Sequence, residues 1–236
     1  MSAGTPHGGV IFDVDGTLLD TNYLHIAAWW EAFRERGHEV QCAEVHRALG
    51  LASAELVERV LGRAEPSVID AHSRHMAPYL GRMRPLPGAA DLLAAVAGLG
   101  LNVVLATSAK DEEIDFMLDA LGARDAIGTV VSSGSVEQAK PAPDIVEAAL
   151  DQSGTERERA VMVGDAVWDV IAARRAGIPC VGLLSGGIAG DELRGAGAVE
   201  VHHDPAALLA SLQTSAVGRL AAPGERVSGH ATAARG

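Results

Sequence analysis

Short apolar runs and longer stretches of helical spacing follow one another along the chain. The first run, Val10 to Phe12, precedes a stretch in which Ile26, Trp29 and Phe33 recur at helical spacing. We expect further strands at 101–106, 128–131, 160–163, 180–184 and 199–201, with helices at 88–99, 112–121, 144–152 and 167–176 between them. Because strands alternate with helices, the pattern predicts an α/β fold with a doubly wound parallel sheet.

The stretch between the first strand and Gly88 breaks this alternation. It contains helical patterns at 43–49, 53–61 and 66–80 with no strand between them, and the Pro-rich segment 84–88 ends it. We therefore predict an α/β core formed by residues 1–19 and 85–212, with a small all-helical cap domain inserted at 20–84. Residues 213–236 are rich in Ala, Gly and Ser, which predicts a disordered tail, with a short helical extension as the alternative.

Composition restricts the partners of the protein. The 236 residues are 48% hydrophobic, and their formal net charge of -12 disfavours binding to nucleic acids or anionic membranes. No apolar run approaches the roughly 20 residues that cross a bilayer, and no export signal begins the chain. The two cysteines, Cys42 and Cys180, have no disulfide or zinc-site spacing. We expect a cytoplasmic protein, either a monomer or a homodimer.

Two carboxylates follow the first strand directly. Asp13 and Asp15 would lie at the carboxyl edge of the sheet, where open α/β sheets bind ligands. Acids this close repel each other unless a divalent cation neutralises them or one holds a proton, which indicates a metal site. A calcium-binding EF-hand loop is excluded, because Thr17 stands at the fifth position and Gly16 comes too early.

Later strands end in residues that suit a phosphate or a metal. Thr107 and Ser108 close the strand at 101–106, although a helix cap is the common role of such residues. Lys140 precedes a stiff Pro-rich loop, where an ammonium group could meet a phosphate, although most loop lysines are simply solvated. Asp165 and Asp169 repeat the acidic theme after the strand at 160–163 and could complete the metal site.

These residues occur in the order of four known motifs, namely Asp13-x-Asp15-Gly16-Thr17, Thr107-Ser108, Lys140-Pro141 and Gly164-Asp165-x-x-x-Asp169. The set resembles the motifs of the haloacid dehalogenase superfamily of phosphohydrolases, and the resemblance spans about Val10 to Asp204. The helical insert after the first motif is similar to the cap of members such as phosphoglycolate phosphatases. The resemblance implies a Rossmann-like core and hydrolysis of a small phosphorylated metabolite, such as phosphoglycolate or a sugar phosphate.

The resemblance also implies roles for individual residues. Asp13 would attack phosphorus and form an aspartyl phosphate, and Asp15 would act as general acid and then base, holding its proton longer than an isolated Asp does. Thr107 and Lys140 would clamp the transferring phosphoryl oxygens. Mg²⁺ would bind to Asp13, the backbone carbonyl of Asp15 and Asp165, with Asp169 either a ligand through water or an orienting group. The phosphate and substrate contacts would come from Gly16, Thr17, Thr107, Ser108, Lys140 and His25.

A sugar phosphomutase is the alternative function. The segment Asp20-Thr21 with His25 and Trp29 resembles that of β-phosphoglucomutases, yet Gly164 stands where those enzymes have Glu, and their arginine-bearing cap loop is replaced by residues 50–53. Two further histidines, His72 and His75, have no carboxylate partner in their stretch, and we expect them at the surface.

Overall fold

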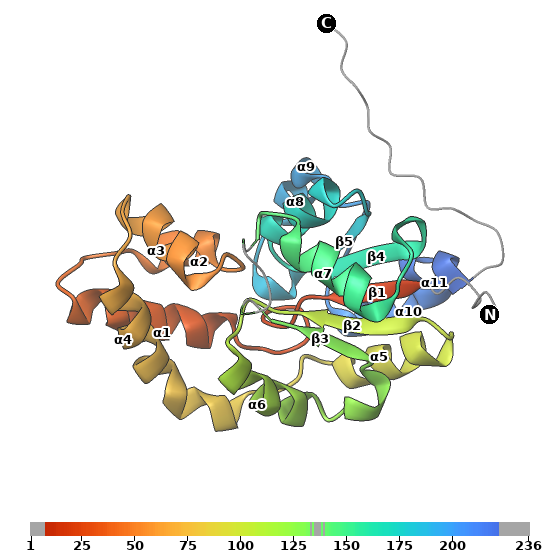
Figure 1. The fold of residues 1–236 in the computed structure, drawn as a ribbon, viewed down its shortest axis with the longest axis horizontal. Helices are drawn as coiled ribbons and strands as arrows, with labels where there is room; N and C mark the ends of the chain where they lie inside the picture. The colour runs from red at the N-terminus through yellow and green to blue at the C-terminus, as the bar shows by residue number, and fades with distance from the viewer. Residues whose placement is uncertain (1–7, 133, 135–137, 139, 222–236) are drawn as a thin grey trace, which may run out of the picture.

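The computed structural model describes residues 8–132, 134, 138 and 140–221. These residues form a six-stranded parallel sheet in the order β3-β2-β1-β4-β5-β6, shown in Figure 1. The strands are β1 (Gly9–Phe12), β2 (Asn102–Ala106), β3 (Thr129–Val131), β4 (Ala160–Gly164), β5 (Cys180–Leu183) and β6 (Glu200–His202). The predicted α/β fold is confirmed, and the strand order reverses at β1, where a ligand crevice is expected.

The helices fall into two groups along the chain. The insertion after β1 contains four helices and a 3₁₀ segment: α1 (Asn22–Glu35), α2 (Cys42–Ala48), α3 (Ser53–Leu61), α4 (Pro66–Met76) and η1 (Ala77–Arg82). The remaining α-helices are α5 (Ala89–Gly98), α6 (Asp111–Leu121), α7 (Asp144–Ser153), α8 (Val167–Arg175), α9 (Gly190–Ala196), α10 (Pro205–Ala210) and α11 (Ala216–Ala221). The short α9 starts and ends near glycines, and its few residues gave no periodic signal in the sequence.

The alternation of side chains along each strand divides the core into two layers. On β1, Val10 and Phe12 face a cluster that includes residues of α5, α6, α10 and α11. Ile11 points the other way, into a cluster with residues of α7, α8 and α9. Figure 1 shows α5 and α6 on one side of the sheet and α7 and α8 on the other. Because both faces are covered, the central strands are apolar throughout, as the opening run of the sequence indicates.

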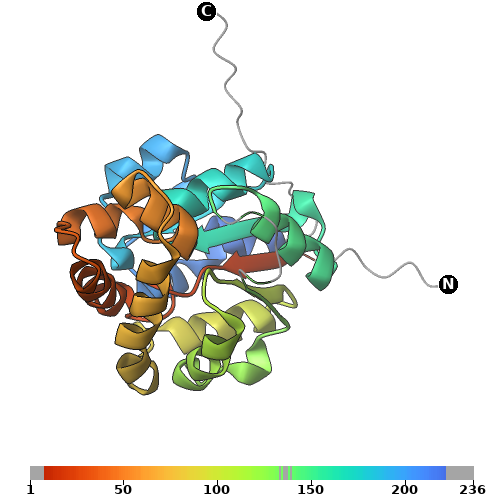
Figure 2. The same cartoon turned by 60° about the vertical axis from the view of Figure 1, so that its left-hand side comes forward.

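The helical insertion has a hydrophobic cluster of its own. Trp29 and Phe33 of α1 pack there with apolar residues of α2, α3 and α4, and Trp168 of α8 packs against the cluster from the sheet side. Trp29 is 3% exposed, whereas Trp30 lies under the guanidinium group of Arg34. Figure 2 brings the insertion forward and shows it beyond one end of the sheet. The insertion therefore has the separate hydrophobic core that a cap domain requires. The domain boundaries at residues 20 and 84 stay a proposal.

Two chain segments join the insertion to the sheet, and they pair with each other. Leu19 and Pro85 form an isolated antiparallel bridge. The backbone N–H of Asp20 donates to the carbonyl of Arg84 at 2.9 Å, and the N–H of Leu86 donates to the carbonyl of Leu18 at 2.8 Å. The connection is therefore a short two-stranded ribbon.

The C-terminal part differs from the sequence prediction. Residues 213–221 are not a disordered tail: after η6 (Leu212–Thr214) the chain forms α11. Ala216, Val217 and Leu220 are buried in the core, and Arg219 pairs with Glu200 of β6. For residues 213–221 the alternative of a short helical extension is therefore correct. The helix is held by packing of its small apolar residues in the core, and so short a helix shows no periodic pattern in the sequence. Residues 1–7 of the predicted core and 222–236 of the predicted tail lie outside the described residues.

Within the described part of the chain, no helix combines the length and the apolar character needed to cross a membrane.

Candidate active site

Three acidic side chains meet at the carboxyl edge of the sheet. Asp13 follows β1 and Asp165 follows β4, which are neighbouring strands, and Asp169 lies on the first turn of α8. One carboxylate oxygen of each residue lies within 4.8 Å of the others, and all three side chains are buried. Parallel strand pairing therefore assembles residues that are far apart in the sequence into one cluster.

Lys140 reaches into this cluster from the loop before α7. Its Nζ donates to Asp13 Oδ1 at 2.5 Å and to Asp169 Oδ1 at 2.9 Å, and the side chain is 0% exposed. Burial alone would lower the pKa of Lys140, but the two carboxylates outweigh burial and raise it, so the side chain is an ammonium ion. The solvated-lysine interpretation is wrong, because the loop directs this side chain into the sheet edge.

Asp165 is held from two directions. Thr17 Oγ1 donates to Oδ1 at 2.8 Å, and Asn22 Nδ2 donates to Oδ2 at 2.9 Å. Burial and the neighbouring Asp169 carboxylate nevertheless raise the pKa of Asp165 to about 7. Burial likewise raises the pKa of Asp13 well above its ordinary value, against the opposing effect of Lys140. The cluster carries more negative charge than its surroundings balance.

Asp15 lies apart from the cluster and faces the insertion. Thr21 Oγ1 donates to its Oδ1 at 2.5 Å, and His25 Nε2 lies 3.3 Å from the same oxygen. Burial would raise the pKa of Asp15, but the His25 charge and the Thr21 hydroxyl outweigh it and lower that pKa. The same carboxylate raises the pKa of His25. The sequence interpretation gave Asp15 a longer-held proton, and the direction of this shift is opposite because the histidine stabilises the carboxylate.

Two glycines allow the loops to close around the acids. Gly16 has a φ of +74°, in the left-handed region, which lets the chain turn immediately after Asp15. A Cβ at Gly186 would collide with the Asp165 carboxylate. The loop after β5 also donates a hydrogen bond from Ser185 Oγ to the Gly16 carbonyl at 2.7 Å. This loop therefore packs directly against the acidic loop and Asp165.

Thr107 and Ser108 occupy different positions at the end of β2. Thr107 is buried, and its Oγ1 accepts a hydrogen bond from the backbone N–H of Ala109 at 3.1 Å. Ser108 reaches the insertion, donating to the carbonyl of Gly50 at 3.2 Å, and it lines the cavity described next.

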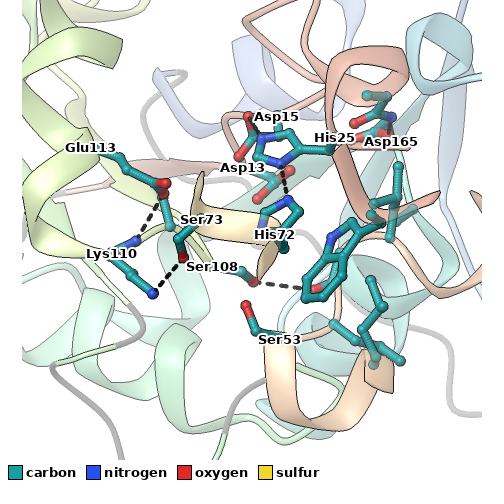
Figure 3. A pocket seen from close by; sticks show the side chains of 18 residues that line it. Asp13, Asp15, His25, Ser53, His72, Ser73, Ser108, Lys110, Glu113 and Asp165 are labelled. Carbon is teal, nitrogen blue, oxygen red and sulfur yellow. Dashed lines mark hydrogen bonds and ion pairs between the residues drawn. The ribbon is translucent and has the colours of Figure 1, made fainter. Parts of the chain in front are cut away.

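A cavity of about 70 Å³ separates the acids from the insertion (Figure 3). Its sheet side includes Asp13, Asp15 and Lys110, and its insertion side includes His25 and Ser53. Apolar walls come from the insertion and the loop after β2, namely Trp29, Leu49, Leu51, Leu56 and Ala109. The cavity thus presents acids at one end and a mixed polar and apolar surface at the other.

Hydrogen bonds hold the insertion over this cavity. Lys110 Nζ donates to Ser73 Oγ of α4 at 2.8 Å, and Trp168 Nε1 donates to the carbonyl of Arg47 at 3.2 Å. His46 Nε2 lies 2.8 Å from the carbonyl of Gly186. These contacts join helices of the insertion to loops at the sheet edge, so the structure represents a closed arrangement.

Sequence reasoning missed two residues of this region and misplaced a third. Asn22 lies on the first turn of α1 beside the predicted acidic loop, a proximity that could have drawn attention to it. Lys110 follows the predicted Thr107-Ser108 pair by two residues, and a basic side chain there was a usable signal. The surface position predicted for His72 is wrong: it is 7% exposed, because it packs on Trp29 inside the insertion. His75 is more exposed and pairs with Glu35 of α1.

The fold, the acidic cluster and a family match together show that the protein is a phosphatase-like α/β hydrolase. Residues 10–183 match the family model described as haloacid dehalogenase-like hydrolase, so the chain belongs to that family.

Relatives with assigned names cover most of the chain. Phosphoglycolate phosphatase of Rhodospirillum rubrum is 32% identical over 217 residues, which are 84% of this chain and 88% of that protein. The crystal structure of a hydrolase from Pseudomonas syringae is 32% identical, covers 88% of this chain and 99% of its own, and has a TM-score of 0.83. A CbbY mutant from Rhodobacter sphaeroides, in complex with xylulose-(1,5)bisphosphate, is 26% identical with a TM-score of 0.71, covering 86% of this chain and 96% of its own.

Proposed function

We propose that the protein is a Mg²⁺-dependent phosphatase that hydrolyses small phosphomonoesters through an aspartyl phosphate on Asp13. The observation that carries this proposal is the buried Lys140 ammonium on Oδ1 of Asp13, a residue that lines the cavity. A phosphoryl group placed before Asp13 would meet this positive charge, and phosphoryl transfer depends mainly on positioning and charge stabilisation. Thr107 and Ser108, at the end of the adjacent strand, would complete the binding of the phosphoryl oxygens.

The acidic cluster fits a divalent cation. Asp13, Asp165 and Asp169 are three buried carboxylates facing the ammonium of Lys140, and burial, together with the neighbouring carboxylates, raises the pKa values of Asp13 and Asp165. Mg²⁺ prefers oxygen ligands of this kind. Asp13, Asp165 and the Asp15 carbonyl would hold it. Asp169 is engaged by Lys140 and by the backbone N–H of Ala166, which favours an orienting role. When bound, Mg²⁺ would neutralise charge that builds on the phosphoryl oxygens.

The chemistry would proceed in two displacements. In the first, an Asp13 oxygen bonds to phosphorus while the bond from phosphorus to the ester oxygen breaks, and Asp15 supplies a proton to that oxygen. In the second, a water oxygen bonds to phosphorus, the bond to Asp13 breaks, and Asp15 accepts the proton that water loses. The lowered pKa of Asp15 suits the second role directly. In the first role, its proton would be shared with the adjacent His25.

The cavity supports a compact substrate. A volume of about 70 Å³ corresponds to roughly five water-sized positions. This supports a substrate with a short organic part, such as phosphoglycolate, over a hexose phosphate in the closed arrangement. Lys110 offers an ammonium group at the cavity wall, with the Ser73 hydroxyl as a hydrogen-bond partner, and this would suit a second anionic group such as a carboxylate. The name of the Rhodospirillum rubrum relative agrees with this choice.

A panel of phosphometabolites tests the proposal. Purified protein with Mg²⁺ would be incubated with phosphoglycolate, ethyl phosphate, p-nitrophenyl phosphate and hexose phosphates, and both released phosphate and isomerised sugar phosphate would be measured. We expect released phosphate, with the highest kcat/KM on phosphoglycolate. Isomerised product without released phosphate would instead support the mutase alternative.

Removal of the metal provides a direct prediction. Exhaustive treatment with EDTA should reduce phosphate release to background, and added Mg²⁺ should restore it, because Asp13 and Asp165 otherwise face each other without sufficient positive charge. Steady-state assays before chelation, after chelation and after Mg²⁺ addition measure the effect. Full activity after chelation would contradict the metal requirement.

Substitution of Lys110 tests the substrate class. Lys110→Met should lower kcat/KM for phosphoglycolate roughly 10- to 100-fold, the size of one lost charge-assisted hydrogen bond. The value for ethyl phosphate, which has no second anion, should change little. Ser73→Ala is the matched control, because it removes the hydrogen bond between Lys110 and α4 but keeps the charge. An equal loss on both substrates would show that Lys110 acts through closure and not through the carboxylate.

A further inference from the structure

Three aromatic rings of the insertion form a stack that ends at Asp15. Figure 3 shows His72, His25 and Asp15 in this order. Trp29 of α1 and His72 of α4 lie with ring centroids 3.8 Å apart and an interplanar angle of 12°. His72 and His25 follow, with centroids 5.5 Å apart and an angle of 22°. His25 Nε2 then lies 3.3 Å from Asp15 Oδ1. A side chain on α4 is thereby connected to an acid on the sheet edge.

The contact between the two histidines is polar as well as aromatic. His25 Nδ1 lies 3.4 Å from His72 Nε2, a hydrogen bond in which the tautomers decide which nitrogen donates. Burial lowers the pKa of His72 well below its ordinary value, so this ring is neutral near pH 7 and has one acceptor nitrogen. His25 can then donate from Nδ1, which leaves Nε2 on the ring edge near Asp15.

The opposite nitrogen of His25 shows why its orientation matters. Nε2 is buried and has no hydrogen-bond partner among the described residues, although Asp15 Oδ1 is only 3.3 Å away. The distance is suitable for a hydrogen bond and the direction is not, so a modest rotation of either side chain would form one. The ring is fixed from its other edge by His72, and Asp15 is fixed by Thr21. The position of His72 therefore determines the orientation of the His25 ring relative to the Asp15 carboxylate.

We propose that His72 is a positioning residue for the proton transfer to the leaving group: it holds the His25 ring so that Nε2 faces Asp15 when the insertion covers the site. This inference rests on the proposed phosphatase function and its assignment of Asp15 as the proton donor. His72 lines the cavity but lies outside the acidic cluster, and its side-chain hydrogen bond joins it to His25. The transfer itself moves one proton from Asp15 to the ester oxygen as the bond between that oxygen and phosphorus breaks, and His25 keeps the geometry of the donor.

The leaving group provides the test. Phosphoglycolate releases an alkoxide-type oxygen that needs a proton, whereas p-nitrophenyl phosphate releases nitrophenolate, which leaves as a stable anion. For each substrate kcat/KM reports the steps up to the first transfer, so the later water attack does not obscure the comparison. His72→Phe keeps a ring on Trp29 and removes the nitrogen that meets His25. We expect this variant to lose roughly 10- to 100-fold in kcat/KM on phosphoglycolate and less than about threefold on p-nitrophenyl phosphate.

Three further single variants and one double variant complete the experiment. His75→Phe makes the same change one turn along α4, at a residue that pairs with Glu35, and should leave both substrates unchanged. His72→Gln returns a polar group without the ring and should recover part of the loss on phosphoglycolate. His25→Phe should show the same dependence on the leaving group, and the double variant with His72→Phe should lose little more than His25→Phe alone.

The possible results separate the two proposals. An equal loss on both substrates, or a loss that follows a lowered melting temperature in all His72 variants, would overturn the positioning role and leave a packing role. Unchanged kcat/KM on phosphoglycolate in His72→Phe would also overturn it. A wild-type protein that hydrolyses neither substrate nor any other phosphomonoester would contradict the proposed function itself.

Discussion

Asp13→Asn should reduce phosphate release at least about 10⁴-fold, the scale of loss when an enzyme loses its nucleophile. The amide has the volume of the carboxylate but is neither an anionic nucleophile nor a charged metal ligand. The fold should persist, because burial and the neighbouring acids already disfavour the charged form of Asp13, and Lys140 keeps its contact with Asp169. Steady-state kinetics and a thermal melt of the same preparation measure the two effects.

Asp20→Asn is the matched control for this variant. Asp20 is exposed, lies on the connection to the insertion and follows the same acidic loop, so the same chemical change there should leave kcat/KM within about threefold of wild type. Activity of Asp13→Asn close to that of the control would remove Asp13 from its role as nucleophile.

Lys140→Met should affect both stability and activity. The variant leaves Asp13 and Asp169 buried without their cation, which costs about 3–5 kcal/mol of folding free energy, or roughly 10 °C in melting temperature. Loss of the phosphate clamp should lower kcat at least about 100-fold. Calorimetry and phosphate release measure these losses.

The stability loss of this variant should shrink as pH falls. Without Lys140, the folded-state pKa of Asp13 rises further above that of the unfolded chain, so the folded state binds more protons and its stability decreases as pH increases. Lys110→Met removes a lysine at an exposed position and should change the melting temperature little at any pH. A Lys140→Met protein as stable as this control would show that the buried ion pairs contribute little.

Most of the fold was predictable because its signals are local. The apolar run from Val10 to Phe12 is buried on both faces, so its sequence shows an uninterrupted hydrophobic segment. The helical insertion was visible as a long interval without strands. The end of the chain was not, because the short α11 owes its stability to packing of Ala216 and Val217 on the sheet, and small residues leave no periodic pattern.

The site was predictable in its components and less so in its contacts. Asp13, Asp165 and Asp169 follow strands, so a parallel sheet necessarily brings them to one edge. The lowered pKa of Asp15 was not foreseeable, because it depends on how His25 of the insertion lies against the sheet edge. His72 was misplaced for a similar reason: its partners, Trp29 and His25, come from another helix, and helical spacing within α4 contains no information about them.

The paired connections between the insertion and the sheet restrict how the two could separate. Two independent linkers would allow the insertion to rotate about many axes. The ribbon around Leu19 and Pro85 is held by hydrogen bonds between its two strands, so it can bend perpendicular to its plane but resists separation of the strands. We therefore expect opening to occur about one axis, with Asp15 on the sheet side and His25 on the other. A molecule opened in this way would admit substrate to Asp13 while separating Asp15 from the histidine. Substrate would then enter while Asp15 and His25 are apart, and the two would come together only after the insertion closes.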